Sequence, residues 1–208
     1  MKYKDTLFYK IVKPVLKVVF KVLYRPTVVG LENLPKEGRI VIAGNHTKWL
    51  DPVMLVSMTN RPVHFLAKKE LFDSWKSSWI VKGMGCIPVN RKIKDSNVLE
   101  SAYKYLENEC CIGIFPEGTI NRTDDIIMPF KIGAVKACNT TNSKLVPFII
   151  TGKYKLFKKS VKLEFLKPIK IGNDLEKENK KFMDIVSKKL AEGGKDKWKK
   201  KKWHGIKL

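Results

Sequence analysis

A histidine and an aspartate five positions apart form the first pair in this chain that could carry out proton-transfer chemistry. His46 follows the apolar run IVIA and a Gly-Asn turn, and Asp51 stands directly before Pro52 and a second apolar run. This pattern predicts a buried strand, a turn, and a helix with Asp51 as its N-cap and Pro52 at its first position. Residues i and i+5 share no face of a helix or strand, so only the turn can bring these two side chains together.

If the two side chains meet, the Asp51 carboxylate can accept a hydrogen bond from one ring nitrogen of His46 and leave the other nitrogen free as a base. The alternative is a surface histidine beside an ordinary helix cap. An H-x4-D pattern on its own favours that alternative, because so short a motif has many chance matches.

Two further apolar runs end in polar residues that could bind a substrate. The segment GCIPVNR ends on Arg91, and the run that begins at Cys111 ends in FPEGT, which contains Glu117. Sites in α/β folds lie in the loops at the carboxyl ends of the sheet strands. We therefore expect His46, Arg91 and Glu117 to lie along one edge of a sheet.

Apolar runs and helical patterns alternate along the rest of the chain. This alternation predicts an α/β domain with a largely parallel sheet flanked by helices. Pro147 lies inside one expected strand, which predicts an edge strand or a bulge there, because proline cannot donate to the ladder. The expected strands are residues 63–67, a short strand ending at Arg91, and residues 111–115, 145–151 and 161–166; the expected helices are residues 71–81, 95–109, 130–139 and 175–190.

The composition points to an anionic partner. The chain of 208 residues has 42 basic and 20 acidic residues and a net charge of +22. A membrane surface, a phosphorylated substrate, an acidic protein or a nucleic acid would fit, although much of the lysine could simply be solvated surface. Only five of the basic residues are arginine. Base-edge readout relies on arginine, so a sequence-specific nucleic-acid reader is disfavoured.

The four cysteines show neither C-x-x-C spacing nor paired histidine ligands. We expect them to be reduced and buried, and we predict no metal site. They are Cys86, Cys110, Cys111 and Cys138.

The N-terminal segment, residues 1–26, combines apolar residues with Lys13, Lys17 and Lys21 at helical spacing. Such a basic amphipathic segment can lie in a membrane interface; the alternative is a helix packed on the core with solvated lysines. Pro14 should divide or kink it. The segment has no uncharged apolar run long enough to span a bilayer and no signal-peptide cleavage site, so we expect peripheral attachment.

We divide the rest of the chain into a main domain, residues 27–192, and a basic tail, residues 193–208. In the tail, Trp198 and Trp203 lie among six lysines between positions 197 and 207. Interleaved indoles and lysines suit an anionic lipid surface or single-stranded nucleic acid, and a solvated terminus is an equal alternative.

Four segments, in order, resemble the motifs of the glycerolipid acyltransferase family, the group that contains 1-acylglycerol-3-phosphate acyltransferase. NHTKWLD resembles the family's N-H-x4-D block, GCIPVNR its G-x-I-P-V-x-R block, FPEGT its F-P-E-G-T block and LVPF its apolar V-P block. The resemblance covers about residues 40–150 and implies a glycerol-3-phosphate acyltransferase-like fold.

The resemblance implies a role for each matching residue. His46 would be the general base and Asp51 its orienter in a direct attack, since the chain has no G-x-S-x-G nucleophile elbow. Arg91 would bind a phosphate, and Glu117, Gly118 and Thr119 would hold the acceptor, with Glu117 contacting a hydroxyl. Many members have arginine after F-P-E-G-T. Here that residue is Ile120, so Arg122 or Lys131 could take its place.

The implied reaction moves an acyl group from acyl-CoA or acyl-carrier protein to the sn-2 hydroxyl of 1-acylglycerol 3-phosphate. The product would be phosphatidic acid, a phospholipid precursor, and no cofactor or metal would be needed. The implied partners are lysophosphatidic acid, the acyl donor and the anionic cytoplasmic face of the cell membrane, with no specific nucleic acid. Rival interpretations are transfer to glycerol 3-phosphate or another lysophospholipid, and a non-catalytic basic membrane- or nucleic-acid-binding protein.

Overall fold

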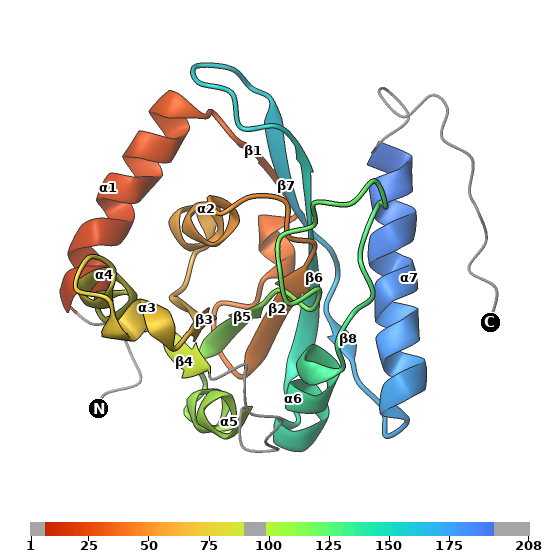
Figure 1. The fold of residues 1–208 in the computed structure, drawn as a ribbon. Coiled ribbons are helices and arrows are strands. Elements are labelled where there is room, and N and C mark those ends of the chain that lie inside the picture. Colours follow the sequence, from red (N-terminus) through yellow and green to blue (C-terminus); the bar gives the residue numbers. More distant parts are fainter. Residues whose placement is uncertain (1–6, 90–98, 194–208) are drawn as a thin grey trace.

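A mixed β-sheet lies at the centre of the computed structural model, which describes residues 7–89 and 99–193 (Figure 1). Eight strands within those residues form the sheet in the order β1-β7-β6-β2-β5-β3-β4, with β8 also paired to β6. The strands are β1 (Thr27–Val29), β2 (Ile40–Gly44), β3 (Val63–Lys68), β4 (Ile87–Val89), β5 (Cys111–Ile114), β6 (Lys144–Gly152), β7 (Val161–Phe165) and β8 (Ile169–Lys170).

Neighbouring strands are parallel over most of the sheet. Strands β6, β2, β5, β3 and β4 run in one direction. Strands β7 and β8 pair antiparallel with β6, and β1 pairs parallel with β7. The predicted α/β fold with a largely parallel sheet is therefore confirmed.

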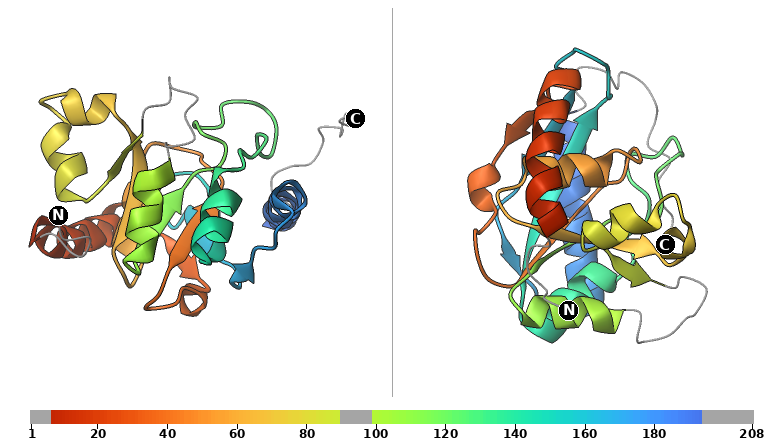
Figure 2. Two further views of the ribbon diagram at one scale, coloured as in Figure 1. Left: turned by 90° about the horizontal axis from the view of Figure 1, so that it is seen from below. Right: turned by 90° about the vertical axis from the view of Figure 1, so that its left-hand side faces the viewer.

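Helices cover both faces of the sheet (Figures 1 and 2). Helices α1 and α2 pack with Ile40 and Ile42 of β2 on one face, whereas α5, α6 and α7 pack with Val41 and Ala43 on the other. Burial on both sides explains why β2 reads as a continuous apolar run rather than an alternating one. The helices are α1 (Leu7–Leu23), the 3-10 helix η1 (Leu31–Asn33), α2 (Asp51–Met58), α3 (Glu70–Asp73), α4 (Ser78–Gly83), α5 (Glu100–Glu107), α6 (Gly133–Thr141) and α7 (Leu175–Gly193).

The connections after β2 and β5 leave the sheet on opposite faces. Strand β2 leads into α2, which packs in one core cluster, and the next helix after the adjacent strand β5 is α6, which packs in the other. A crevice forms at the carboxyl ends of two parallel strands whose connections diverge in this way. The loops that follow β2 and β5 thus lie at the edge of the sheet where α/β folds commonly have their sites.

The single helix expected over residues 71–81 is wrong, because the structure has two short helices there. Helix α3 ends where Ser74 adopts an extended backbone, and the hydroxyl of Ser77 donates a hydrogen bond to the carbonyl of Leu71, 2.7 Å away. Serine side chains that bond to nearby backbone groups compete with the helix. Helix α5 confirms the later part of the helix expected over residues 95–109. The expected start, at Asp95, lies outside the described residues.

The expected edge position of the strand that contains Pro147 is also wrong. Strand β6 is central, with β2 on one side and β7 and β8 on the other. The Pro147 carbonyl accepts a hydrogen bond from Leu166, which lies in the gap between β7 and β8. The proline nitrogen faces the same side of the strand, so its missing N–H falls where the neighbouring strand is interrupted.

Helix α1 continues through Pro14, so the expected division into two helices is wrong. Tyr9 before Pro14 and Phe20 after it are both buried in the same core cluster. Packing on both sides holds the helix together despite the lost N–H. No helix among the described residues is long and apolar enough to cross a membrane.

All four cysteines are free thiols. Cys110, Cys111 and Cys138 are buried as expected, whereas Cys86 is only partly buried. Burial raises the pKa of Cys86 to about 11 and that of Cys111 to about 12. Both groups are therefore thiols rather than reactive thiolates at neutral pH.

Candidate active site

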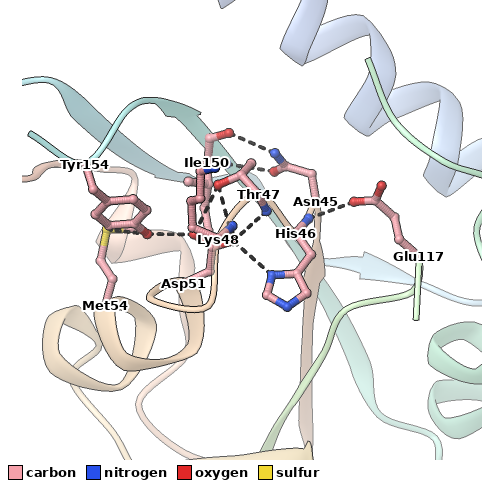
Figure 3. Close-up of polar contacts among 9 residues, drawn as sticks. All are labelled: Asn45, His46, Thr47, Lys48, Asp51, Met54, Glu117, Ile150 and Tyr154. Atoms are coloured by element: carbon pink, nitrogen blue, oxygen red, sulfur yellow. Dashed lines mark hydrogen bonds and ion pairs between the residues drawn. The ribbon is translucent and has the colours of Figure 1, made fainter. Parts of the chain in front are cut away.

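Asn45 fixes the end of β2, immediately before His46. Its side-chain Nδ2 donates to the carbonyl of Ile150 on β6, and its Oδ1 accepts from the Ile150 N–H, both at 2.8 Å (Figure 3). The preceding residue must be glycine, because a Cβ on Gly44 would lie 2.0 Å from the Phe148 carbonyl oxygen. The base of the turn that carries His46 is thus tied to the neighbouring strand. In the sequence, Asn45 appeared as a turn residue and as the first residue of the N-H-x4-D block, and neither pattern indicated its bonds to Ile150.

His46 and Asp51 meet across the turn, as predicted. The Nδ1 atom of His46 lies 2.9 Å from Oδ2 of Asp51. The Asp51 side chain is fully buried, whereas that of His46 is 15% exposed. A carboxylate can only accept this hydrogen bond, so the contact favours the tautomer with the proton on Nδ1 and the lone pair on Nε2. In Figure 3 the second ring nitrogen points away from the other labelled residues.

Asp51 is not the N-cap that the sequence predicted. Helix α2 begins at Asp51 itself, with Leu50 in the cap position. The Oδ2 atom of Asp51 accepts hydrogen bonds from the backbone N–H groups of Thr47 (2.6 Å) and Lys48 (2.8 Å). The carboxylate therefore organises the turn before the helix rather than the first turn of the helix, which closes the loop around His46.

The imidazole ring of His46 stacks on Phe115, the first residue of FPEGT. The ring centroids are 4.0 Å apart and the planes are inclined by 19°. Phe115 in turn stacks on Phe65 and meets Phe148 edge to face. Phe65 lies in β3, Phe148 in β6, and Phe115 directly follows β5, so this aromatic cluster from three segments of the chain fixes the plane of the His46 ring.

Glu117 holds the backbone of His46. The carboxylate is buried, and its Oε1 accepts the His46 N–H at 2.7 Å while Oε2 accepts the Met128 N–H at 2.9 Å. Burial raises the pKa of Glu117, and the two backbone hydrogen bonds partly oppose that rise. The structure thus gives Glu117 a positioning contact, and its predicted contact with an acceptor hydroxyl stays a prediction.

Lys131 lies against the FPEGT turn. Gly118 adopts a positive φ of 74°, and a Cβ at this position would lie 2.9 Å from Nζ of Lys131. The backbone N–H of Lys131 donates to the carbonyl of Pro116 at 2.9 Å. Thr119 and Arg122 are exposed on the same loop. The turn and Lys131 therefore come together at the carboxyl end of β5.

Arg91, the predicted phosphate ligand, lies outside the described residues. Strand β4, which precedes it, ends at Val89 and pairs in parallel with β3. Within residues 7–89 and 99–193, no group of three or more His, Cys, Asp or Glu side chains could hold a metal ion.

A partly exposed histidine paired with a buried aspartate, with one imidazole nitrogen turned outward at a switch point of an α/β sheet, can accept a proton from a bound hydroxyl group. The sequence model of the family described as "Acyltransferase" matches residues 25–151. The chain belongs to the glycerolipid acyltransferase family, as its four motifs indicated.

Two curated relatives are each named 1-acyl-sn-glycerol-3-phosphate acyltransferase. The protein from Bacillus subtilis is 34% identical over 146 residues, which cover 69% of this chain and 71% of that relative. The protein from Borreliella burgdorferi is 34% identical over 136 residues, which cover 64% of this chain and 54% of that relative.

The fold is similar to the crystal structure of the 1-acyl-sn-glycerophosphate acyltransferase PlsC from Thermotoga maritima. The TM-score is 0.72 with 22% sequence identity, and the match covers 92% of this chain and 81% of that one. At this identity the similarity concerns the fold alone.

Proposed function

We propose that this protein transfers an acyl group from a coenzyme A or acyl-carrier-protein thioester to the sn-2 hydroxyl of 1-acylglycerol 3-phosphate. The product is phosphatidic acid, an intermediate of phospholipid biosynthesis. The observation that carries the proposal is the 2.9 Å contact between His46 Nδ1 and the buried Asp51 carboxylate. The names of the curated relatives support this choice of acceptor.

His46 acts as a general base on the acceptor. Its Nε2 removes the proton of the sn-2 hydroxyl as that oxygen attacks the thioester carbonyl, and the Asp51 carboxylate stabilises the imidazolium that forms. The tetrahedral intermediate then expels the thiolate, which takes the proton from His46 and leaves as a free thiol. The new ester forms as the thioester breaks, so no covalent acyl-enzyme is needed.

Cationic side chains bind the acceptor phosphate. We assign the place of the family arginine, occupied here by Ile120, to Lys131 rather than Arg122. The support is the position of the Lys131 Nζ beside Gly118 of the FPEGT turn; both side chains are exposed, so exposure does not distinguish them. Arg91 supplies a second, bidentate contact. The backbone of Gly118 and Thr119 then lies beside the phosphate or glycerol end of the acceptor.

Helix α1 attaches the protein peripherally to an anionic membrane, at the cytoplasmic face. It presents three sectors around its axis. One sector is buried against the core and includes Tyr9 and Phe20, and a second carries the lysines. The third is apolar and exposed; its members are Ile11, Val15, Val18 and Val22. An exposed apolar sector beside a basic one suits the boundary between lipid headgroups and acyl chains.

A product assay on the purified full chain tests the proposed reaction. The acceptors are lysophosphatidic acid, glycerol 3-phosphate and a lysophospholipid without a terminal phosphate, each with acyl-CoA and with acyl-carrier protein. We expect phosphatidic acid from lysophosphatidic acid with at least one donor. If product formed only with another acceptor, that acceptor, and not lysophosphatidic acid, would be the substrate. Absence of product from every pair would contradict catalysis and favour a binding protein.

A further inference from the structure

Tyr154 contacts the catalytic aspartate from a distant part of the chain. It lies in the segment 153–160 between β6 and β7, and its hydroxyl donates a hydrogen bond to Oδ1 of Asp51 at 2.7 Å (Figure 3). The other contact of Oδ1 is a longer one from the Thr47 hydroxyl, at 3.2 Å. His46 and the two backbone N–H groups of the turn bond to Oδ2 instead.

We propose that Tyr154 is a positioning residue for acyl transfer: its hydroxyl sets the orientation of the Asp51 carboxylate so that Oδ2 faces His46. This inference rests on the proposed function, in which His46 is the base. A hydrogen bond from a hydroxyl to a carboxylate is charge-assisted and therefore strong. Because Asp51 is fully buried, no water can replace that donor without entering the core.

The electrostatic surroundings keep Tyr154 a donor. Burial raises the pKa of Tyr154, and the neighbouring Asp51 carboxylate raises it further. The phenol therefore stays protonated throughout the pH range in which a transferase would be assayed.

Helix α1 holds Tyr154 in place from the other side. The ring of Tyr24 meets that of Tyr154 edge to face, with centroids 5.6 Å apart. The backbone N–H of Phe157 donates to the carbonyl of Leu23, the last residue of α1. Tyr154 thus joins the end of the proposed membrane-docking helix to the catalytic carboxylate.

The test compares Tyr154→Phe with Tyr24→Phe in the full chain. Both variants keep the aromatic ring and lose one hydroxyl, but only Tyr154 donates to Asp51. We expect Tyr154→Phe to lower kcat by about 10–100-fold, as for other partners that orient a reactive group, with little change in either KM. Tyr24→Phe should match the wild type in kcat and melting temperature, whereas Tyr154→Phe should melt at a lower temperature, because a buried hydrogen bond is lost, and yet be fully folded at the assay temperature.

A spectroscopic readout separates this inference from the proposed reaction. The Nδ1 proton of His46 should give a downfield proton NMR signal, identified by its loss in His46→Ala. We expect Tyr154→Phe, but not Tyr24→Phe, to shift that signal even if the acceptor proves to be a different one. An unchanged signal and an unchanged kcat in Tyr154→Phe would show that the hydroxyl does not position the pair.

A second inference comes from three exposed tryptophans. Trp49, Trp75 and Trp79 are 69%, 82% and 60% exposed. Trp49 lies in the catalytic turn after β2, and the other two follow the carboxyl end of β3, so all three lie beyond the edge of the sheet that carries the site. Exposed lysines accompany them; they are Lys48, Lys76 and Lys82.

We infer that this tryptophan–lysine surface contacts an anionic lipid bilayer and turns the catalytic edge toward the lipid phase. Tryptophan favours the headgroup depth of a membrane, and lysine is attracted to anionic lipid. This surface is separate in sequence from α1, so it adds a second attachment point to the proposed docking helix.

Fluorescence quenching by brominated lipid tests the second inference. The protein is a chain in which Trp49, Trp198 and Trp203 are replaced by phenylalanine, so that only Trp75 and Trp79 emit. With vesicles that contain anionic lipid, we expect sedimentation of the protein together with quenching by bromine at shallow acyl positions. Sedimentation without quenching would contradict bilayer contact by this tryptophan–lysine surface but not membrane docking by α1. Absence of sedimentation would contradict both.

Discussion

His46, the proposed general base, is held at three points by residues from different parts of the chain. Asp51 binds its Nδ1 atom, Phe115 stacks on its ring, and Glu117 accepts its backbone N–H. A general base is effective only when its lone pair is directed at the proton to be removed. The site therefore uses one carboxylate for the ring and another for the backbone.

Removal of the proposed phosphate contacts should chiefly weaken binding of the acceptor. Loss of a charge-assisted contact costs about 1.5–3 kcal/mol, so Arg91→Ala and Lys131→Ala should each raise the KM for lysophosphatidic acid by roughly 10–100-fold. Initial-rate measurements with each substrate varied in turn make the comparison, and Arg122→Ala serves as the matched control. If only the KM of the acyl donor changed, the phosphate would bind elsewhere.

Glu117 should make stability depend on pH in a definite direction. Burial raises its folded pKa above the usual value of 4.5, so the folded state binds the proton more tightly than the unfolded state. The contribution of Glu117 to stability is therefore present below the unfolded pKa and is lost as pH rises through the folded pKa. Urea unfolding of the wild type and Glu117→Gln, at pH 4 and pH 7, measures this difference.

We expect the stability of the wild type relative to Glu117→Gln to be lower at pH 7 than at pH 4. If the wild type instead became more stable relative to Glu117→Gln as pH rose, the two backbone hydrogen bonds would outweigh burial.

At the scale of elements, local sequence was sufficient for the strand-turn-helix unit that contains His46 and Asp51. The apolar run, the Gly-Asn turn and the Asp-Pro pair are all local signals. The contacts that complete the site have no local sequence signal, because Glu117 and Tyr154 lie 71 and 103 residues from their partners in the turn that carries His46 and Asp51. Only the order of strands in the sheet brings these segments together.

The errors in the predicted elements have the same origin. The central position of Pro147 depends on where β7 gives way to β8, which no pattern around residue 147 reveals. The break between α3 and α4 did have a local signal, because Ser74 and Ser77 are of a residue type that bonds to nearby backbone groups and competes with the helix. Trp75 and Trp79 lie four positions apart within the expected helix, as two residues of one buried helix face would, yet both side chains are exposed.

Helix α1 should bind vesicles through two separable contributions. Each lysine near an anionic surface contributes about 1 kcal/mol, which salt weakens, whereas apolar burial resists salt at roughly 0.8 kcal/mol per methylene. Replacement of the exposed apolar sector by alanine should remove the salt-resistant part of binding. Replacement of Lys10, Lys17 and Lys21 by glutamine should remove the salt-sensitive part.

Point variants are preferable to deletion of residues 1–25. The Tyr9 hydroxyl accepts the Val63 N–H and Phe20 is buried, so deletion would damage the core as well as the docking sector. Vesicle sedimentation at low and high salt makes the measurement. If both sets of variants sedimented like the wild type, α1 would be a core helix only.

At the scale of the whole molecule, one buried guanidinium joins the loops at the amino ends of the strands. Arg61 is 7% exposed and donates to the carbonyls of Pro35, Gly38 and Glu109 at 2.8–3.1 Å. The Arg61→Leu variant leaves three carbonyls without this donor, so we expect a loss of about 2–4 kcal/mol in the free energy of unfolding. Equilibrium unfolding in urea measures the loss.

Arg39→Leu is the matched control for that variant. Its guanidinium is exposed and donates to one carbonyl, that of Thr141 at 3.1 Å. Exposed substitutions usually change stability by less than about 0.5 kcal/mol. Equal losses in the two variants would contradict the stabilising role assigned to the buried guanidinium.

The most direct test of the central claim is the transfer rate of His46→Ala with lysophosphatidic acid and the preferred acyl donor. The imidazole is partly exposed and lies on a turn, so its removal should leave the melting temperature close to that of the wild type. Loss of a general base should lower kcat by about 10²–10⁴-fold. A correctly folded His46→Ala protein that formed phosphatidic acid at nearly the wild-type rate would contradict the account.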